Sequence, residues 1–562
     1  MNTVDLRRRR PIAALLVAAI ALGSCAAPQL VTPPPTATAC GVPSYSCALP
    51  YPSSRFEIAD ATTATGVRIE LPSRVLAAGL AEQLGPGASL SEAASGADGF
   101  SPLSPIVFQA PDGIDPDSVP TDGGALVTVS DGAGRRQAVR AEVSSEGTDD
   151  RGRRGVLLVW PVTHWPLGQR ITATVGDGLR SPEGRSTRLW ESTTNFMVAT
   201  NASITGEVDR LASVVRSDEH PVRGLVVSPS LLGGAALLTG QVAVTDFRDR
   251  NGVIPRLGQA TGRRLWVDFL MTLPERPASD RGAPVAIYGH GISISKETAF
   301  IVAGQNAQHG VATIAIDVPL HGSRVPADGY LFDLIQPTNL GRIAAMILQG
   351  ELDLVSLLDA VQTSLATLDT LPLRIDGRHG DDRPDLDVNR IYYQGTSMGG
   401  FLGTTFVGLA PELKGAFVQV GGAGIIDTIF HSVLWGAFRG LMPVGAPPGD
   451  AHALIAGAQQ LMDRSDPTYY LDRIRRAGTP FFLVYATNDG VVGNPMSGRV
   501  IELGGLPRTA GAVPQDGRGV LEIAGAPANA DPLRAFLAHT QFTSPASVAA
   551  LDGWWDRMLA LA

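Results

Sequence analysis

Short, mostly apolar runs alternate with helix-length segments through the second half of this 562-residue chain. The runs lie at residues 265–271, which has the period of a half-buried strand, and at 283–288, 312–316, 391–393, 415–420 and 481–486. Short, mostly apolar runs are typical of buried strands, and strands that alternate with helices are typical of a parallel sheet. The pattern therefore predicts an α/β domain over residues 264–562.

Between residues 101 and 200 the apolar runs are separated by turn signals alone. They lie at 106–108, 125–129, 156–160 and 171–175, with pairs such as Asp-Gly and Gly-Gly between them. Glycine adopts the positive φ angles of tight turns at little cost. This spacing predicts a small β-sandwich before the α/β domain.

Two segments have mixed patterns. Residues 201–263 combine a helix-like stretch with short strand-like stretches, and we interpret them as a connector between the two domains. Residues 425–442 are rich in Ile, Phe, Leu and Trp. They predict either a cap over an active site, which would extend over 425–475, or a helix buried in the core.

Composition narrows the function classes. With 44% apolar and 18% charged residues the chain is globular, and its length allows more than one core. The formal net charge of −9 argues against a nucleic-acid partner. The sequence leaves the oligomeric state open.

The first 24 residues predict a signal peptide. Arginines 7–10 precede an apolar run at 11–22, which is too short to span a bilayer. The sequence Leu-Gly-Ser-Cys ending at Cys25 resembles the lipobox of bacterial lipoproteins, which implies lipidation of Cys25, membrane anchoring and a cell-envelope location. A plain secretory signal cleaved nearby is the alternative.

Residues 25–100 are expected to contain a tether and an N-terminal segment. Proline, threonine and alanine dominate between residues 26 and 39, as in flexible linkers. In an exported protein, the closely spaced Cys40 and Cys47 predict one local disulfide.

The sequence around Ser397 has the form Gly-x-Ser-x-Gly, between the apolar run 391–393 and a further apolar segment. This is the context of a nucleophile elbow, a sharp turn from strand to helix. Side chains at Gly395 and Gly399 would collide with the neighbouring strand and helix. The turn would expose the serine hydroxyl and place the amide of Met398 at a helix N-terminus, where it can face an oxyanion.

A second loop completes the predicted oxyanion hole. Gly289, His290 and Gly291 follow the strand-like run at 283–288, and the amide of Ile292 is the expected second donor. We expect the glycines to allow close approach of the substrate oxygen. We assign His290 a structural role in this loop, although histidine could also act as a base.

An acid and a base follow in the order that a hydrolase requires. Asp489 follows the strand-like run at 481–486, where the acid that orients the histidine belongs. Asp427, after the preceding strand, is the alternative acid. His539 is the one histidine downstream of Asp489 and is therefore the predicted base.

Several stretches together resemble one family. The residues at 287–292, 296–299, 316–322 and 385–387 resemble bacterial lipoprotein lipases and lysophospholipases described as virulence-factor lipases, over about residues 284–424. The resemblance implies an α/β-hydrolase fold with Ser397 as nucleophile. Ile294 stands where close relatives are expected to have glycine, and Thr396 stands where many lipases have histidine. Residues 104–184 resemble bacterial Ig-like domains.

These features predict an exported serine esterase or lipase that hydrolyses lipid-like esters through an acyl-enzyme and needs no cofactor. An exported serine peptidase and a binding lipoprotein with a non-catalytic hydrolase scaffold are the alternatives. No metal site is predicted. The aspartates at 376–387 could bind calcium, but their spacing does not match an EF-hand, and a solvated acidic turn is the simpler interpretation.

Overall fold

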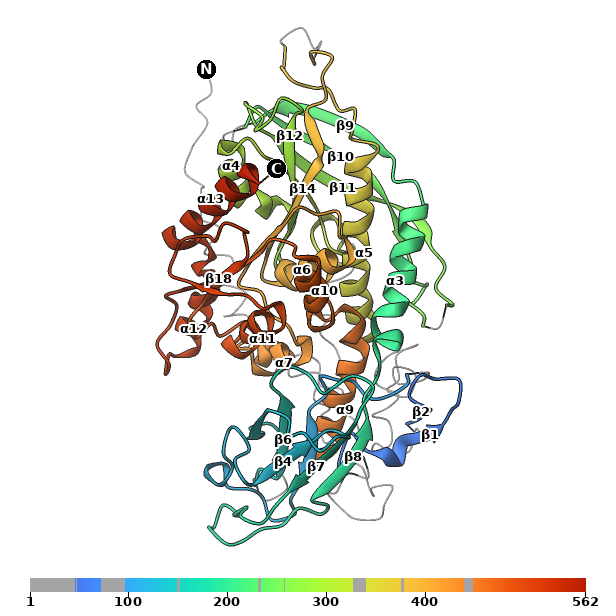
Figure 1. Cartoon of the computed structure of the whole chain (residues 1–562), viewed down its shortest axis with the longest axis vertical. Helices are drawn as coiled ribbons and strands as arrows, with labels where there is room; N and C mark the ends of the chain where they lie inside the picture. The colour runs from blue at the N-terminus through green and yellow to red at the C-terminus, as the bar shows by residue number, and fades with distance from the viewer. Residues whose placement is uncertain are drawn as a thin grey trace, which may run out of the picture.

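The computed structural model describes residues 46, 48–71, 97–148, 152–230, 234–256, 258–326, 340–374, 379–438 and 448–561 (Figure 1). Three small sheets lie at the lower end of the view, and a large sheet flanked by helices lies above them. Cys25, Cys40 and Cys47 lie outside the described residues, so the predicted anchor and disulfide remain predictions.

The N-terminal part contains two antiparallel sheets with the strand orders β3-β6-β5 and β4-β7-β8. The strands are β3 (Ile106–Gln109), β4 (Val127–Ser130), β5 (Val139–Val143), β6 (Val156–Pro161), β7 (Arg170–Val175) and β8 (Thr193–Met197). Their inward side chains share one apolar core, so the sheets form a β-sandwich. Strands β5 and β8 were not predicted from the apolar pattern, because polar residues alternate with apolar ones along them.

The folded part begins earlier than the predicted boundary at residue 101. The short strands β1 (Glu57–Ala59) and β2 (Val67–Ile69) pair with each other, and Tyr51 pairs with Val107 of the sandwich. Tyr51 is only 2% exposed. Residues 48–71 therefore contribute to the core of the sandwich.

The large sheet has ten strands in the order β17-β18-β16-β15-β14-β12-β13-β11-β10-β9. From β17 to β13 all neighbours are parallel, and β11, β10 and β9 add an antiparallel edge. The parallel strands are β12 (Ala283–Gly289), β13 (Ala312–Ile316), β14 (Leu386–Thr396), β15 (Ala416–Gln419), β16 (Phe481–Ala486), β17 (Arg508–Thr509) and β18 (Gly519–Ile523). This arrangement confirms the predicted α/β class.

The segment 201–263 is not a connector, which corrects the sequence-based interpretation. It supplies helix α3 (Asn201–Ser217), strand β9 (Val222–Pro229) and strand β10 (Ala236–Asp246). Strand β10 pairs along its whole length with β11 (Arg263–Leu273). The signal was weak because β9 is a largely exposed edge strand and because Gly240 and polar neighbours interrupt the apolar pattern of β10.

Helices cover both faces of the large sheet. One face packs on α4 (Phe300–Gln308) and α13 (Pro545–Ala560), and the other packs on α3, α5 (Leu340–Gln362) and α6 (Met398–Leu409). In α13, Trp554 and Trp555 are fully buried against Tyr392. Within the described ranges, none of the helices combines the length and apolar character needed to cross a membrane.

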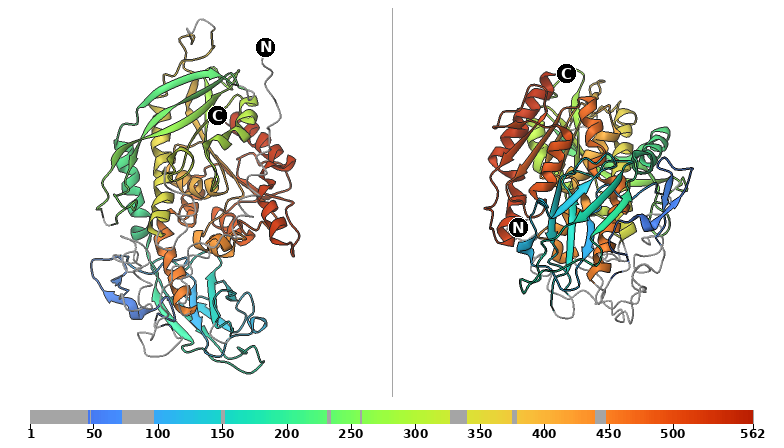
Figure 2. Two further views of the ribbon diagram at one scale, coloured as in Figure 1. Left: turned by 180° about the vertical axis from the view of Figure 1, so that it is seen from behind. Right: turned by 60° about the horizontal axis from the view of Figure 1, so that its bottom comes forward.

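Three further helices lie between the large sheet and the sandwich (Figures 1 and 2). They are α7 (Ile425–His431), α8 (Trp435–Phe438) and α9 (Pro448–Met462), and α9 contacts both β3 and α5. The predicted cap segment therefore packs against the sandwich as well as against the hydrolase-like part.

Candidate active site

Ser397 lies in a strained turn between β14 and α6. Its backbone adopts φ +56° and ψ −119°, a region that residues with side chains rarely occupy. A Cβ atom at Gly395 would lie 2.4 Å from the carbonyl oxygen of Gly399, and one at Gly399 would lie 2.1 Å from that of Gly289. The glycines of the motif are therefore required by backbone contacts, as expected for a nucleophile elbow.

The structure brings Ser397, His539 and Asp489 together. The Nε2 atom of His539 lies 2.8 Å from Oγ of Ser397, and its Nδ1 atom lies 2.7 Å from Oδ2 of Asp489. A carboxylate only accepts hydrogen bonds, so Nδ1 carries the proton and Nε2 is left to accept the serine hydroxyl. This is the tautomer that a base for Ser397 needs.

Asp489 is held by its own turn. Its Oδ1 atom accepts hydrogen bonds from the amides of Val491 at 2.8 Å and Val492 at 3.0 Å. The carboxylate is 4% exposed, and His539 is 8% exposed. The pair is shielded from water, whereas Ser397 is half-exposed and accessible to a substrate.

His539 is the last residue of helix α12 (Pro532–His539), which Asp531 caps through the amides of residues 533 and 534. The amide of Gly490 donates to the carbonyl of Ala535 at 2.9 Å, which ties the acid loop to this helix. Gln419 at the end of β15 donates to the carbonyl of Phe542 at 3.0 Å. Sequence reasoning missed Gln419 because a lone glutamine after a strand carries no motif.

The predicted oxyanion loop lies beside the nucleophile. A Cβ atom at Gly291 would lie 3.5 Å from Cβ of Ser397, so the absence of a side chain leaves room for a substrate oxygen. Met398 is the first residue of α6, and the first amides of a helix have no acceptor within it. Ile292 directly follows the loop glycine and is half-buried.

His290 holds this loop in place, as its predicted structural role requires. It is 0% exposed, its Nδ1 atom lies 2.8 Å from the carbonyl of Gly291, and its Nε2 atom accepts from the amide of Val318 at 3.0 Å. Burial lowers the pKa of His290, which agrees with a neutral ring that donates at one nitrogen and accepts at the other.

A buried ion pair also holds the loop. The carboxylate of Asp317 accepts from the amide of Lys296 at 2.8 Å and from its Nζ at 2.9 Å, and from the amide of Ser323 at 2.8 Å. Burial alone would raise the pKa of Asp317, but these donors lower it. The pair joins the end of the oxyanion loop to the loop after β13. Lys296 could have been noticed as one of two lysines in the chain.

The alternative acid and the two departures from the family pattern have other roles. Asp427 is bound by Arg140 and Arg499 and makes no hydrogen bond to His539. Thr396 is 3% exposed and contacts Gln419, so its side chain is not on the open side of Ser397. A Cβ atom at Gly291 would lie 3.2 Å from Cδ1 of Ile294, which places that side chain over the oxyanion loop.

Within the residues that the structure describes, no group of three or more His, Cys, Asp or Glu side chains is arranged to bind a metal. In the acidic loop, Asp385 accepts from Thr370, and Asp369 accepts from the amides of Asp381 and Asp382. These carboxylates stabilise turns. Residues 375–378 lie outside the described ranges.

Comparison with solved structures finds similar folds at low identity. An acetyl xylan esterase from Paenibacillus sp. R4 is 16% identical, with a TM-score of 0.37 over 60% of this chain and 92% of that one. Acetyl xylan esterase 1 from Thermoanaerobacterium sp. JW/SL YS485 is 12% identical, with a TM-score of 0.35 over 60% and 95%. No protein-family profile matches the sequence, and comparison with curated proteins finds no similar sequence.

The strand order and the elbow decide the fold. The nucleophile follows a central parallel strand, the acid follows β16, and the histidine follows β18. The chain has an α/β-hydrolase fold. In this hydrolase fold the antiparallel strands β9 to β11 extend one edge, and the β-sandwich lies next to the helices α7 and α9.

Proposed function

We propose that this chain is a serine hydrolase that cleaves carboxylic esters through an acyl-enzyme. The observation that carries the proposal is the continuous hydrogen-bonded series from Ser397 through His539 to Asp489, at a strained elbow beside a glycine loop. A non-catalytic scaffold has no need for the strained serine or for the buried acid–histidine pair.

The reaction proceeds in two halves. Ser397 attacks the ester carbonyl while His539 takes its proton, and the amides of Met398 and Ile292 bind the oxyanion. His539 then protonates the leaving alcohol. In the second half His539 takes a proton from water, which attacks the acyl-enzyme, and His539 then gives this proton to Oγ of Ser397 as the carboxylic acid leaves. Asp489 keeps the imidazole oriented and stabilises its positive charge.

Apolar side chains around α7 favour an apolar acyl group, and the amide of Val433, just after α7, donates to the carbonyl of Gly490 beside Asp489 at 2.6 Å. A hollow is lined only by apolar or aromatic side chains: Leu340, Ile426, Ile429, Phe430, Trp435, Leu454, Ile455 and Ala458. Met398, next to the nucleophile, packs on the same apolar cluster that contains Ile426 and Trp435. An acyl chain that extends from Ser397 toward α7 and α8 would be buried there.

We also propose that the enzyme is exported and attached to a membrane through Cys25. The support is the signal-like start of the chain and the lipobox-like sequence that ends at Cys25. Replacement of Cys25 by alanine should release the protein from the membrane fraction. Unchanged sedimentation with membranes would contradict the anchor without affecting the triad.

The test of the reaction is hydrolysis of a chain-length series of esters and lysophospholipids, alongside a panel of peptides, by wild type and Ser397→Ala. We expect ester hydrolysis by the wild type only, together with labelling of Ser397 by a fluorophosphonate. Equal activity of both proteins would exclude the triad. Cleavage of peptides alone would exclude the esterase and support the peptidase alternative.

A further inference from the structure

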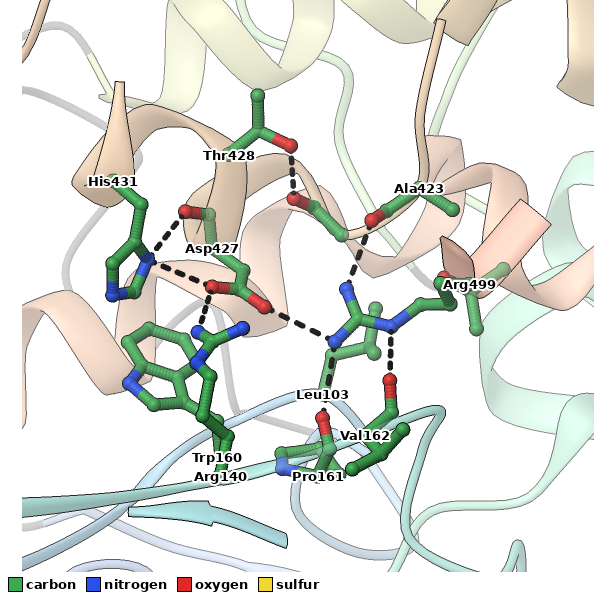
Figure 3. A network of polar contacts seen from close by, with 12 residues as sticks. Leu103, Arg140, Trp160, Pro161, Val162, Ala423, Asp427, Thr428, His431 and Arg499 are labelled. Carbon is green, nitrogen blue, oxygen red and sulfur yellow. Dashed lines mark hydrogen bonds and ion pairs between the residues drawn. The ribbon is translucent and has the colours of Figure 1, made fainter. Parts of the chain in front are cut away.

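The β-sandwich contacts helix α7 through a network of charged side chains (Figure 3). We name it the Asp427 network: Arg140 and Glu142 on β5, Asp427 and His431 on α7, and Arg499 on α11 (Asn494–Gly504). Its members come from three parts of the chain that are far apart in sequence. None of them belongs to the triad.

Asp427 is the centre of the network. Its Oδ1 atom lies 2.6 Å from Nη2 of Arg140, and its Oδ2 atom lies 3.0 Å from Nη2 of Arg499. The carboxylate is 3% exposed. Burial alone would raise its pKa, but Arg140, His431 and Arg499 hold the pKa of Asp427 well below its usual range. The group is therefore a buried, permanently ionised carboxylate with three cationic partners.

Arg499 lies on α11, the helix that follows the Asp489 loop, and it connects this helix to the start of α7 and to the sandwich. It donates to the carbonyl of Ala423 at 2.8 Å, just before α7. It also donates to the carbonyls of Pro161 at 3.0 Å and Val162 at 3.1 Å, at the end of β6. Arg499 is 2% exposed, so all these bonds form away from water.

His431 makes the second connection. Its Nδ1 atom lies 2.9 Å from Oδ1 of Asp427, and its Nε2 atom lies 2.7 Å from Oε1 of Glu142. Trp160 on β6 donates to the same Glu142 oxygen at 2.7 Å. The Trp160 ring also lies 6.0 Å from that of Phe430. The sandwich thus holds both a charged and an aromatic residue of α7.

Helix α7 has two functional faces. Asp427 and His431, four residues apart, point to the sandwich, as Figure 3 shows. Ile426, Ile429 and Phe430 line the apolar hollow. A change in the position of α7 relative to the sandwich therefore changes the shape of the hollow.

We propose that the β-sandwich is part of the substrate-binding machinery, and that Arg140 is a positioning residue that sets acyl-chain selectivity by fixing α7. This inference rests on the proposed ester hydrolysis. A short acyl group that ends near Ser397 does not reach α7. A long acyl group that extends toward α7 would contact the apolar face of this helix, so its binding would depend on where the sandwich holds the helix.

The test measures kcat and KM of wild type, Arg140→Met and Arg135→Gln on acetyl, butyryl, octanoyl and lauroyl esters. Arg135 is the matched control because it is 69% exposed and pairs with Asp131 within the sandwich. For Arg140→Met we expect acetyl hydrolysis close to wild type and a change of about tenfold or more in kcat/KM for the long esters, mainly through KM. Arg135→Gln should keep the wild-type profile.

Arg140→Lys and Glu142→Gln provide a second test if Arg140→Met does not fold. Lysine keeps the charge but loses the planar fork, so Arg140→Lys should show a smaller shift in selectivity in the same direction. A parallel loss on all chain lengths, or an unchanged profile in folded variants with normal fluorophosphonate labelling, would overturn the inference. Absence of any ester hydrolysis or labelling in wild type would instead overturn the proposed function, and the inference with it.

Discussion

Two aspartate–histidine pairs of the described residues, Asp489–His539 and Asp427–His431, differ in what the second imidazole nitrogen contacts. His539 bonds Asp489 through Nδ1 and Ser397 through Nε2. His431 contacts Asp427 through Nδ1 and Glu142 through Nε2. Since carboxylates accept only, both nitrogens of His431 carry protons, whereas His539 keeps one lone pair for the nucleophile.

The hydrogen-bond donors around each aspartate differ too. Asp427 contacts two arginines, whereas the other oxygen of Asp489 accepts from two backbone amides. One pair is a structural contact that is charged at neutral pH, and in the proposed mechanism the other accepts a proton and returns it. An aspartate–histidine contact in a hydrolase fold is therefore not evidence of catalysis until the second nitrogen is assigned.

The largest expected effect follows from replacing His539. His539→Gln should lower kcat by on the order of 10⁴–10⁶-fold, because Ser397 loses its base. His309→Gln, at a histidine that pairs with Asp552 on the surface, is the control and should keep normal rates. Steady-state ester hydrolysis measures both. A loss below about tenfold in His539→Gln would show that another group serves Ser397.

Replacing each aspartate separates their roles. Asp489→Asn should lower kcat by about 10⁴-fold, because asparagine favours the wrong tautomer of His539. Asp427→Asn should lower the free energy of unfolding by about 3–5 kcal/mol, because the buried Arg499 and the partly exposed Arg140 lose their shared partner. Asp489→Asn should therefore lower kcat on the acetyl ester far more than the free energy of unfolding measured in urea. Asp427→Asn should lower the free energy of unfolding more than kcat. Similar losses of kcat and of unfolding free energy in both variants would show that the two aspartates do not have different roles.

Loss of the Lys296–Asp317 pair should produce an intermediate effect on catalysis. Lys296→Met should lower kcat by about 10–100-fold with little change in KM, because the oxyanion loop loses its anchor while the triad stays intact. Lys414→Met replaces the only other lysine and should have no effect. A change in KM alone would assign the pair to substrate binding rather than to loop position.

The smallest expected effect is a dependence of stability on alkaline pH. Burial alone would lower the pKa of His431, but Asp427 and Glu142 raise it to about 9. Because the folded-state pKa exceeds the ordinary value of about 6.5, the stabilisation is complete below that value and is lost as pH rises through about 9. The indole of Trp160, which has no titratable group, also packs against this ring.

The measurement is the Tm between pH 6 and pH 10 for wild type and His431→Gln. The decline of Tm above pH 8 should be smaller in the variant, since it has no proton to lose there. Parallel curves would show that other groups cause the alkaline destabilisation.

The residues of the candidate site were easier to choose from the sequence than the architecture around it. Ser397, Asp489 and His539 could be chosen because a local motif, a strand-end position and a count of histidines each identify one residue. Arg140 could not, because its partner Asp427 lies 287 residues away and neither residue has a motif. Lys296 was quoted only for its resemblance, since its contact with Asp317 depends on two adjacent loops.

The strands of the large sheet also differ in how well the sequence predicted them. Buried strands such as β12 and β16 were predicted because every residue in them is apolar or small. Strand-like stretches were noted within β9 and β10, but their place in the large sheet was not predicted, because it depends on tertiary pairing with β11 more than on their own propensity. The predicted Ig-like identity of the sandwich remains a resemblance.

The antiparallel edge of the large sheet limits which fragments of the chain can fold. A polypeptide that starts at residue 264 would lack β9 and β10, and β11 would present its row of unpaired amides and carbonyls along most of eleven residues. Such a fragment should aggregate through this edge. A fragment that starts at residue 201 would restore the edge but leave the buried charges of Asp427 and Arg499 without their sandwich partners. We therefore expect the part of the chain that contains the large sheet to need the sandwich in order to fold.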